Sequence, residues 1–337
     1  MIQELYFYHA PAFQPRRNQA LEAYFTERVK AGQLVFYLWQ NEKTVFIGRN
    51  QSAFAECDVK ALEADGGFLA RRLSGGGAVY HDKENLNFTF ALQKADYDSR
   101  KQTEVILEAV RSLGLDARRS GRNDLTIDGR KFSGHSYYKR KEQCFHNGTL
   151  LLDTDLGAMQ RYLKVPAEKL KSHKVRSVPS RVVNLRELLP GLQISQLVTA
   201  LREAAEKVYG LPARTITEDA LDEDGIKTYF ERFSSPDWLY GEETGGAYSL
   251  GRRFPWGQFH LRFDIEDGRL SGVKIFSDGL EAAWLRRLAA SWEGLPAERS
   301  ALIRALEAVA EESESESDLK AIKDDIKTFV KEQKPFN

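Results

Sequence analysis

The chain has 337 residues, of which 42% are apolar and 29% charged, and its 49 basic residues balance 49 acidic ones. This length predicts about two domains, each able to bury its own core, and the ordinary composition excludes a disordered or fibrous protein. The absence of net charge argues against a protein that coats nucleic acid, so any site for an anion must be local.

The N-terminal region and the cysteine content indicate a protein of the reducing cytoplasm. The longest apolar stretch near the N-terminus, residues 34–39, is far shorter than the ~20 residues of a membrane helix, and no basic region followed by an apolar run marks a signal peptide. Only Cys57 and Cys144 are present, so a disulfide framework is not expected. The six histidines are scattered and form no zinc-ligand pattern. We therefore expect neither a membrane nor a nucleic acid among the partners.

The N-terminal segments predict a helix followed by paired strands. Helical spacing of apolar residues extends over residues 15–31, where Asn18 can cap the helix and Gly32 can end it. Two β-rich runs, residues 34–39 and 44–47, are separated by a short polar segment. They predict a hairpin or a meander.

Further strands and a second helix follow. Asp58 can cap a short helix that ends at residue 63, and residues 68–73 predict a strand that leads into a run of glycines. Apolar and polar residues alternate over residues 86–92, which is typical of a half-buried strand. Residues 101–113 place their apolar side chains on one stripe of a helix.

The order of the elements indicates the fold class. Residues 124–127 lead through the hairpin dipeptide Asp128-Gly129 into a returning strand, residues 149–152 predict another strand, and shorter helices fill residues 155–210. Because strands and helices do not alternate strictly, we expect an α+β fold with a mainly antiparallel or mixed sheet flanked by helices. This order argues against a doubly wound nucleotide fold.

Turn formers at residues 234–246 indicate a domain boundary. We expect a large domain over residues 1–240 and a small α+β C-terminal domain over residues 241–337. The small domain begins with predicted strands at residues 258–265 and 269–276 and ends with helices.

Three consecutive glycines, residues 75–77, follow a predicted strand. Glycine permits a positive φ and has no Cβ, so backbone N–H groups can approach a phosphate or a carboxylate. On a strand, Arg72 and Ser74 point to one face and Arg71 to the other, so one arginine and one serine can meet the same ligand. A plain glycine turn between strands is the alternative interpretation.

A second polar stretch is strongly basic. Residues 111–141 hold nine Lys or Arg and three Asp, a local positive excess that is typical of a site for an anionic ligand. Lys131 follows the Asp-Gly turn, and Asn123 and Asp124 precede that turn. Taken singly, these residues also fit a solvated lysine and an ordinary turn.

A third basic run covers residues 164–181 and contains Pro166 and Pro179. It fits a mobile lid that closes on a polyanion, and it also fits a solvated surface loop. The run by itself leaves both interpretations open.

Five motifs occur in the order seen in the lipoate-protein ligase A family, which the chain resembles over essentially its whole length. They are RLSGGGAVYHD at residues 72–82, GRNDL at 121–125, GRKFSG at 129–134, FHNGTLL at 145–151 and SVPSRVVNL at 177–185. Each motif is weak alone, but five in this order are specific together.

The resemblance implies the biotin/lipoate ligase-like fold, with a catalytic domain over residues 1–240 and an accessory domain over residues 241–337. It implies an AMP-forming ligase that uses ATP and Mg²⁺ to activate lipoate as lipoyl-adenylate, with release of pyrophosphate. The lipoyl group then passes to a lysine of an acceptor, either a lipoyl domain of a 2-oxoacid dehydrogenase E2 subunit or the glycine cleavage H protein. Carboxylate and triphosphate repel each other, so such a site needs cations between them.

The resemblance also implies roles for individual residues. Lys131 is the expected catalytic cation, and Asp124 is the expected contact for Mg²⁺, which prefers oxygen ligands. The residues expected to bind ATP or the adenylate are Arg72, Gly75, Gly76, Gly77, Ala78, Val79, Tyr80, Asn123, Asp124, Lys131, Ser180 and Arg181. Those expected to bind the lipoyl group are Arg72, Ser74, His81, Lys131 and His146. Each of the two histidines also fits a satisfied position in the core.

Cys144 leaves a second activity open. It stands near the position at which related octanoyltransferases carry the cysteine of a Lys-Cys acyl-transfer pair, and a Lys131–Cys144 pair would transfer an octanoyl group through a thioester without ATP. We favour a buried apolar cysteine. A carrier-binding module without catalysis is a third alternative, and it would not need Lys131, so this lysine argues against it.

Overall fold

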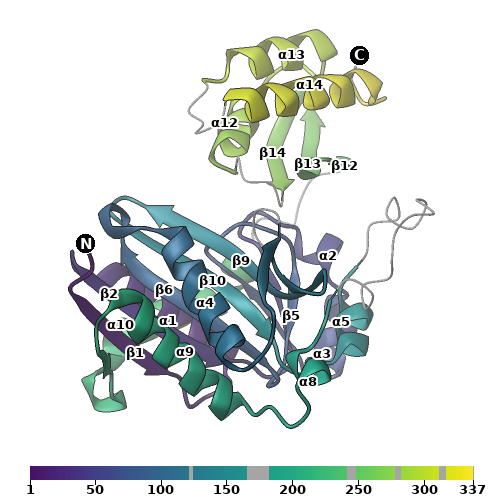
Figure 1. The fold of residues 1–337 in the computed structure, drawn as a ribbon. Coiled ribbons are helices and arrows are strands. Elements are labelled where there is room, and N and C mark those ends of the chain that lie inside the picture. Colours follow the sequence, from purple (N-terminus) through teal and green to yellow (C-terminus); the bar gives the residue numbers. More distant parts are fainter. Residues whose placement is uncertain (121–123, 165–181, 241–247, 278–281, 311–315, 337) are drawn as a thin grey trace. The chain divides into compact units, whose positions relative to one another are not determined.

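The computed structural model describes the whole chain except residues 121–123, 165–181, 241–247, 278–281, 311–315 and 337 (Figure 1). The chain divides into two compact units. The first unit comprises Met1–Ile47, Glu56–Ser74 and Ala78–Leu239. The second comprises Gly48–Ala55, Gly75–Gly77 and Tyr240–Asn337, so two short segments belong with residues much further along the chain.

An eight-stranded mixed sheet is the centre of the first unit. Its strand order is β11-β1-β2-β6-β10-β9-β8-β7. β1 pairs in parallel with β2 and β11, and the other neighbours are antiparallel. The bounds are β1 Glu4–His9, β2 Gln33–Gln40, β6 Asn85–Gln93, β7 Arg118–Ser120, β8 Asp124–Ile127, β9 Arg130–Arg140, β10 Gln143–Leu151 and β11 Ala213–Thr215. The predicted α+β class with a mixed sheet is confirmed.

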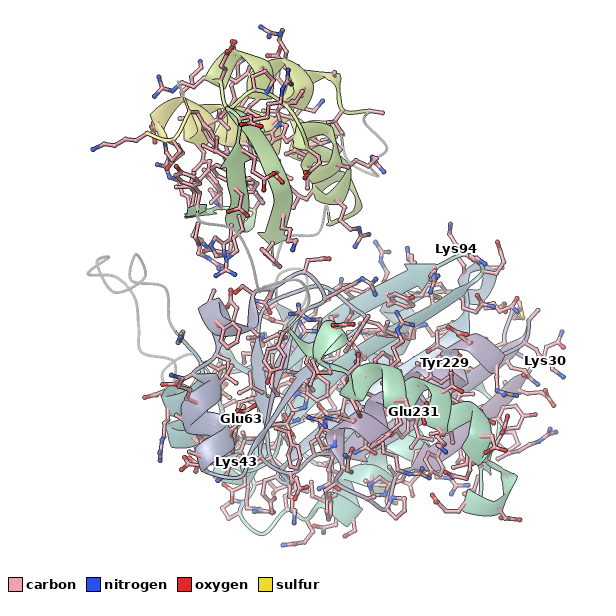
Figure 2. The ribbon with its side chains drawn as sticks, turned by 180° about the vertical axis from the view of Figure 1, so that it is seen from behind. Lys30, Lys43, Glu63, Lys94, Tyr229 and Glu231 are labelled. Atoms are coloured by element: carbon pink, nitrogen blue, oxygen red, sulfur yellow. The ribbon has the colours of Figure 1, made fainter. Side chains whose placement is uncertain are left out.

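Helices cover both faces of this sheet (Figure 1). On one face lie α1 (Pro15–Arg28) and α10 (Glu223–Ser234), which pack with the side of β2 that carries Tyr37. On the other lie α4 (Ser99–Ser112) and α9 (Ile194–Tyr209), which pack with the side that carries Phe36. Tyr229 of α10, labelled in Figure 2, donates a hydrogen bond to Glu27 of α1 at 2.6 Å. The central strands β2 and β6 are therefore buried on both faces, whereas β7 at the edge of the sheet is exposed.

Shorter elements connect these layers. A second sheet has the order β4-β3-β5, with β3 at Thr44–Ile47, β4 at Phe68–Arg71 and β5 at Val79–His81. The short helices are α2 Ala53–Glu56, α3 Val59–Ala64, η1 Lys94–Asp96, α5 Leu156–Tyr162, α8 Leu185–Leu188, η2 Glu218–Ala220 and α11 Pro236–Leu239.

The predicted hairpin or meander of residues 34–39 and 44–47 is wrong. Both runs form strands, but β2 pairs with β1 and β6 in the large sheet, whereas β3 pairs with β4 and β5. β3 and β4 are parallel, and parallel strands need a crossover connection, which here contains α3. The pairing thus depends on partners that a local pattern does not identify.

The alternation along β6 is present, but the expected half-buried strand is wrong. Asn85, Asn87 and Thr89 are as completely buried as the apolar residues between them. Asn85 donates to Asn87 at 2.9 Å, and Thr89 donates to Glu22 of α1 at 2.7 Å. The alternation therefore separates an apolar face from a buried polar face whose groups bond to one another.

The helix ends follow local capping chemistry, with one correction. Gln14, not Asn18, caps α1, and Asn18 lies inside the helix with its side-chain amide bonded to the Gln40 carbonyl at 2.7 Å. Asp58 caps α3 as predicted by accepting from the Ala61 N–H at 3.1 Å. Only short helices were predicted over residues 155–210. This is wrong for α9, which lies in that range and has 16 residues.

In its described residues, the main part of the second unit is an antiparallel sheet of three strands with three helices. These elements are β12 Tyr248–Phe254, β13 Gly257–Glu266, β14 Arg269–Ser277, α12 Ala282–Trp292, α13 Arg299–Ala308 and α14 Glu316–Glu332. Phe259, Leu261 and Phe263 of β13 pack in the same core as Trp284 and Trp292 of α12. No helix in the described part of the chain combines the length and the apolar character of a membrane span.

Candidate active site

Lys131 lies at the start of β9, directly after a tight turn. Asp128 and Gly129 have positive φ angles of 49° and 74°, which confirms the turn that the Asp-Gly dipeptide predicts. Lys131 Nζ lies 2.7 Å from Asp124 Oδ1, and the two side chains are 39% and 45% exposed. The predicted catalytic cation and the predicted metal contact therefore form an ion pair that is open to solvent.

A β-bulge accompanies the lysine. The register of β8 against β9 shifts by one residue at Phe132, and such bulges change the direction of neighbouring side chains. A Cβ on Gly134 would lie 2.8 Å from Lys131 Nζ and 2.9 Å from its Cε. Gly134 therefore leaves the space that the lysine side chain occupies, a role that its place in the motif alone did not reveal.

A hydrogen-bonded network joins α1 to the face of β9 and β10 on which Gly134 lies. Glu22 Oε1 accepts from Asn147 Nδ2 at 2.8 Å and from Thr89 Oγ1 at 2.7 Å. Asn147 Oδ1 in turn accepts from Ser136, whose hydroxyl lies 2.9 Å from that of Ser74. We call this set the Glu22 network: Glu22, Ser74, Thr89, Ser136 and Asn147. It includes Ser74, which the motifs predict as a lipoyl contact.

The carboxyl group of Glu22 is unusual because it is completely buried. Burial raises the pKa of Glu22 to about 7, although the hydrogen bonds from Thr89 and Asn147 and the charge of Arg72 act in the opposite direction. Glu22 thus changes its protonation state near neutral pH. The sequence gives little sign of this, because a Glu within an amphipathic helix usually faces solvent.

Arg72 and Arg71 have different surroundings, as strand alternation predicts. Arg72 is buried, and its Nη1 donates to the Phe46 carbonyl at 3.2 Å. Arg71 donates from Nε to the Trp238 carbonyl and from Nη2 to the Leu239 carbonyl, both at 2.9 Å. Arg71 therefore holds α11, whereas Arg72 is the arginine whose charge acts on Glu22.

The three glycines at residues 75–77 belong to the second unit. Gly76 has a φ of 92°, a conformation that L side chains rarely adopt. A Cβ on Gly48 of the same unit would lie 2.1 Å from the Gly76 carbonyl oxygen. The backbone path thus requires glycine at both positions, and the signal at Gly48 was missed. Binding of a nucleotide by Gly75, Gly76 and Gly77 stays a prediction.

The segment that follows the glycines enters the first unit at Ala78 and forms β5, which includes Val79, Tyr80 and His81. His81 is buried, with its Nδ1 3.1 Å from Asn41 Nδ2. Burial lowers the pKa of His81 to about 3, and the charge of Arg72 acts in the same direction. His81 is therefore neutral at physiological pH. Tyr80 is also buried, and burial raises its pKa.

His146 faces the opposite side of the sheet from the Glu22 network. Its Nδ1 lies 3.0 Å from Gln102 Oε1 of α4, and its Nε2 lies 2.8 Å from His135 Nδ1. His135 Nε2 lies 3.1 Å from Ser133 Oγ. Burial lowers the pKa of both imidazoles, that of His135 to about 3. The structure thus places His146 in a buried, neutral histidine pair and does not bring it together with Ser74.

Cys144 and Lys131 lie at different ends of the β9–β10 hairpin. Cys144 pairs with Lys139, eight residues along β9 from Lys131, which corresponds to roughly 26 Å at the usual rise of a strand. The Cys144 thiol is buried near the Leu92 carbonyl, and burial raises its pKa to about 11. Cys144 is thus a buried cysteine, as we favoured, and it does not pair with Lys131 in this structure.

Three predicted site residues, Asn123, Ser180 and Arg181, lie outside the described residues, as does most of the basic run at 164–181. Val182, the first described residue after this run, lies beside Lys131. Val182 forms a parallel bridge with Lys131, and the Val183 N–H donates to the Lys131 carbonyl at 2.8 Å. Within the described ranges, no group of three or more His, Cys, Asp or Glu side chains is arranged to hold a metal ion.

Comparison with protein families assigns both parts of the chain. Residues 14–206 match the lipoyl protein ligase A/B catalytic domain, and residues 247–328 match the bacterial lipoate protein ligase C-terminus. The first match alone covers more than half of the chain. The chain belongs to the lipoyl protein ligase A/B family, whose members are enzymes of the ligase or transferase class.

Solved structures agree with this assignment. LipL1 of P. falciparum, in complex with lipoate, is 23% identical, with a TM-score of 0.81 over 96% of this chain and 99% of that one, which shows a shared fold. A bipartite lipoate protein ligase from Thermoplasma acidophilum, described with its E2 lipoyl domain, is 28% identical, with a TM-score of 0.64 over 73% of this chain and 100% of that one. A lipoate-protein ligase A bound with ATP is 27% identical, with a TM-score of 0.61 over 72% and 99%.

Proposed function

We propose that the protein is an ATP-dependent, AMP-forming lipoate-protein ligase. The observation that carries the proposal is Lys131, a partly exposed ammonium group placed by a tight turn and a bulge, with Gly134 leaving it room. Two similar structures support the substrates, since one is a ligase bound with ATP and another is described with its E2 lipoyl domain.

The reaction has two steps. A carboxylate oxygen of lipoate attacks the α-phosphorus of ATP. The bond between this phosphorus and the oxygen that bridges it to the β-phosphorus breaks. The products are lipoyl-adenylate and pyrophosphate. The neutral amine of the acceptor lysine then attacks the lipoyl carbonyl carbon, the bond to AMP breaks, and the nitrogen loses a proton. Negative charge builds at the carbonyl oxygen and the α-phosphate, so a fixed cation beside both stabilises the transition states.

In this proposal Lys131 supplies that cation. Its ion pair with Asp124 is open to solvent, so an anionic substrate can replace the carboxylate as the partner of the ammonium group. Arg72 and Ser74 hold the carboxyl end of lipoate, and the segment of residues 75–80 meets the nucleotide. The remaining assignments rest on the family resemblance: adenylate contacts at Asn123, Ser180 and Arg181, and a lipoyl contact at His81.

His146 receives a different role in the proposal. Because it is buried on the α4 face with His135, direct contact with the lipoyl group does not suit its position. We propose instead that His146 stabilises β9, since it bonds to His135, which in turn bonds to Ser133.

The chemistry of Asp124 fits Mg²⁺. The ion is usually held by one or two carboxylates together with substrate phosphates, and Asp124 offers a carboxylate that is 45% exposed. Mg²⁺ held there would neutralise charge on the triphosphate.

The proposed acceptor is a lipoyl domain of a 2-oxoacid dehydrogenase E2 subunit or the glycine cleavage H protein. We also propose that the enzyme acts in the cytoplasm, because Cys57 and Cys144 are both free and buried. An octanoyltransferase that uses no ATP is the alternative, but its Lys-Cys pair does not form here.

The test is incubation of the protein with ATP, Mg²⁺ and lipoate, followed by addition of an apo-lipoyl domain. We expect pyrophosphate release without the acceptor and a mass increase of one lipoyl group on the acceptor. Lys131→Ala should slow pyrophosphate release and lipoyl transfer, adenylation by roughly 30-fold or more. Lys139→Ala is the matched control, because Lys139 is an exposed lysine of the same strand that lies over the Tyr97 ring.

Cys144 provides a further arm of this test. Cys144→Ser should leave ligation unchanged, because the activated intermediate is a mixed anhydride and not a thioester. Octanoyl transfer from an acyl carrier without ATP, together with no pyrophosphate release, would establish the alternative. An acyl-thioester trapped on Cys144 would have the same consequence.

A further inference from the structure

The segment that begins at Val182 lies directly against the backbone of Lys131. The Val183 N–H donates to the Lys131 carbonyl at 2.8 Å. The next residue, Asn184, exchanges two hydrogen bonds with Thr154, which follows β10: the Thr154 N–H donates to Asn184 Oδ1 at 3.1 Å, and Asn184 Nδ2 donates to the Thr154 carbonyl at 3.0 Å. This segment therefore connects the predicted catalytic lysine to the end of β10.

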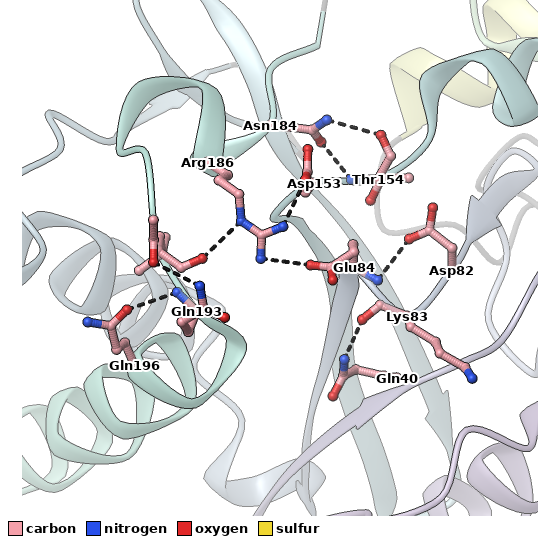
Figure 3. A network of polar contacts seen from close by, with 12 residues as sticks. Gln40, Asp82, Lys83, Glu84, Asp153, Thr154, Asn184, Arg186, Gln193 and Gln196 are labelled. Carbon is pink, nitrogen blue, oxygen red and sulfur yellow. Dashed lines mark hydrogen bonds and ion pairs between the residues drawn. The ribbon is translucent and has the colours of Figure 1, made fainter.

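Arg186 holds the same segment through every nitrogen of its guanidinium group (Figure 3). Nη1 donates to Asp153 at 2.7 Å, Nη2 to Glu84 at 3.0 Å, and Nε to the Leu192 carbonyl at 3.0 Å. The backbone N–H of Arg186 also donates to the Leu152 carbonyl at 2.9 Å. A planar guanidinium donates from three nitrogens in fixed directions, whereas the three N–H groups of a lysine rotate about a single nitrogen.

Glu84 extends these contacts to the strand that carries His81. The Glu84 N–H donates to Asp82 Oδ1 at 3.0 Å, and the Asp155 N–H donates to Asp82 Oδ2 at 2.8 Å. The Glu84 carbonyl accepts from the Leu152 N–H at 3.0 Å. Asp82 directly follows His81, the last residue of β5. We call Arg186, Glu84 and Asp153 the Arg186 cluster.

We propose that Arg186 is a positioning residue for Lys131, an inference that rests on the proposed function. Arg186 joins three stretches that are far apart in the sequence: the turn before β6, the end of β10, and the segment whose Val183 bonds to Lys131. Arg186 thereby fixes the position of the Lys131 backbone relative to β5, where the nucleotide is proposed to bind. Without Arg186, the carboxylates of Glu84 and Asp153 would both lose the guanidinium group from which they accept.

The stability effect of this cluster is expected to be small. The side chains of Arg186, Glu84 and Asp153 are 25%, 41% and 51% exposed, and ion pairs of this kind contribute little to global stability. Val183 and Leu185 are fully buried and keep the segment in the core. A local change at Lys131 without global unfolding is therefore the expected consequence of removing the guanidinium group.

The first measurement does not depend on activity. Hydrogen exchange of peptides that cover residues 182–189 is compared in the free wild-type protein and in Arg186→Leu. We expect the Val183 amide to exchange at least ten times faster in the variant, with an almost unchanged Tm. Arg17→Leu is the matched control: Arg17 forms a similar forked pair, with Glu223 at 2.7 and 2.8 Å, and its side chain is 29% exposed.

The second measurement is the rate of lipoate-dependent pyrophosphate release. Arg186→Leu should lower kcat about tenfold and leave the KM values for ATP and lipoate within about twofold, because the lysine is displaced while the binding groups remain. Arg17→Leu should leave both parameters unchanged. A structural defect alone would reduce the active fraction and would appear equally in the exchange of distant peptides.

The outcomes separate the two proposals. Unchanged exchange at Val183 in Arg186→Leu, or faster exchange with an unchanged kcat, would overturn the positioning role. A wild-type protein that releases no pyrophosphate would overturn the proposed function, while the exchange measurement would still show whether Arg186 holds the Lys131 backbone.

Discussion

At the scale of single residues, the ammonium group of Lys131 is the cation proposed to lie beside the reacting carbonyl oxygen and the α-phosphate. Lys131→Ala should cost about 2 to 4 kcal/mol of transition-state stabilisation, the usual effect of deleting one preorganised charge donor. This corresponds to a fall in adenylation rate of roughly 30- to 1000-fold. Single-turnover pyrophosphate release at saturating ATP and lipoate measures it.

The Lys131 result has a clear contrary outcome. The lysine is partly exposed, and among the described residues its ammonium group pairs with Asp124, so the Tm should change little on its removal. Adenylation at the wild-type rate by a folded Lys131→Ala protein would show that the cation is supplied elsewhere.

Glu22 predicts a pH dependence of stability. Its pKa is about 7 in the folded protein and 4.5 when exposed, so the folded state binds the additional proton between these values. The free energy of unfolding therefore falls as the pH rises from about 4.5 to 7, by about 3 kcal/mol, and stays lower above pH 7. Glu22→Gln keeps an acceptor for Asn147 and Thr89 and removes this charge, so it should flatten the dependence.

Urea unfolding of the two proteins at pH 5 and pH 8 measures this difference. Glu104→Gln is the control, because Glu104 is an exposed carboxylate of α4 that pairs with Arg111. An equal loss of stability between pH 5 and pH 8 in wild type and Glu22→Gln would show that Glu22 stays charged or that water reaches it.

At the scale of elements, alanine substitution of two glycines of the β9–β10 hairpin, Gly134 and Gly148, should have different effects on activity and stability. A Cβ on Gly134 would meet the mobile end of Lys131, which can move aside, so Gly134→Ala should lower activity with little change in Tm. A Cβ on Gly148 would lie 2.6 Å from the Gly134 carbonyl and 2.5 Å from the Phe88 ring. These groups cannot move freely, so Gly148→Ala should lower the stability by about 1–3 kcal/mol.

The measurement is the Tm of each variant together with its rate of pyrophosphate release per folded molecule. If Gly134→Ala retained full activity, Lys131 would have enough alternative rotamers to act from another position. If Gly148→Ala were as stable as wild type, the β9–β10 hairpin would have relaxed to admit the methyl group.

Local signals predicted several elements well. The Asp-Gly turn between β8 and β9, the Asp58 cap of α3, and the bounds of β13 and β14 within one residue each depend on neighbours in the sequence. The parallel pairs of β1 with β2 and β11 depend on distant segments, and β1 was not predicted. β3 was predicted as a strand, but its pairing with β4 and β5 was not.

The residues of the candidate site also differ in whether the local sequence reveals them. The motifs at residues 72–82 and 129–134 are visible because glycines and charged residues stand out within a short window. Glu22, 125 residues from Asn147, and Arg186, 102 residues from Glu84, obtain their surroundings from contacts between distant segments. The face to which His146 points follows from the register of β10, which the motif does not reveal.

For the whole molecule, the important feature is that the two units have separate hydrophobic cores. Trp292 lies fully buried in the second, where its Nε1 donates to the Leu302 carbonyl at 3.1 Å. Phe36 lies fully buried in the first and stacks on Phe90 at 4.4 Å. Substitution by alanine should cost about 3–5 kcal/mol in either core, because each leaves a large cavity.

The unit affected should decide which segments become loose. Segments 48–55 and 75–77 belong to the second unit, and the Ser277 N–H donates to the Asn50 carbonyl at 2.7 Å. Trp292→Ala should therefore speed hydrogen exchange in these segments together with β13 and β14, whereas Phe36→Ala should speed exchange in β2 and β6. Peptide-resolved exchange of both variants measures this directly. If Phe36→Ala loosened residues 75–77 and Trp292→Ala did not, the glycine segment would depend on the first core, and the small domain would have no influence on the proposed nucleotide loop.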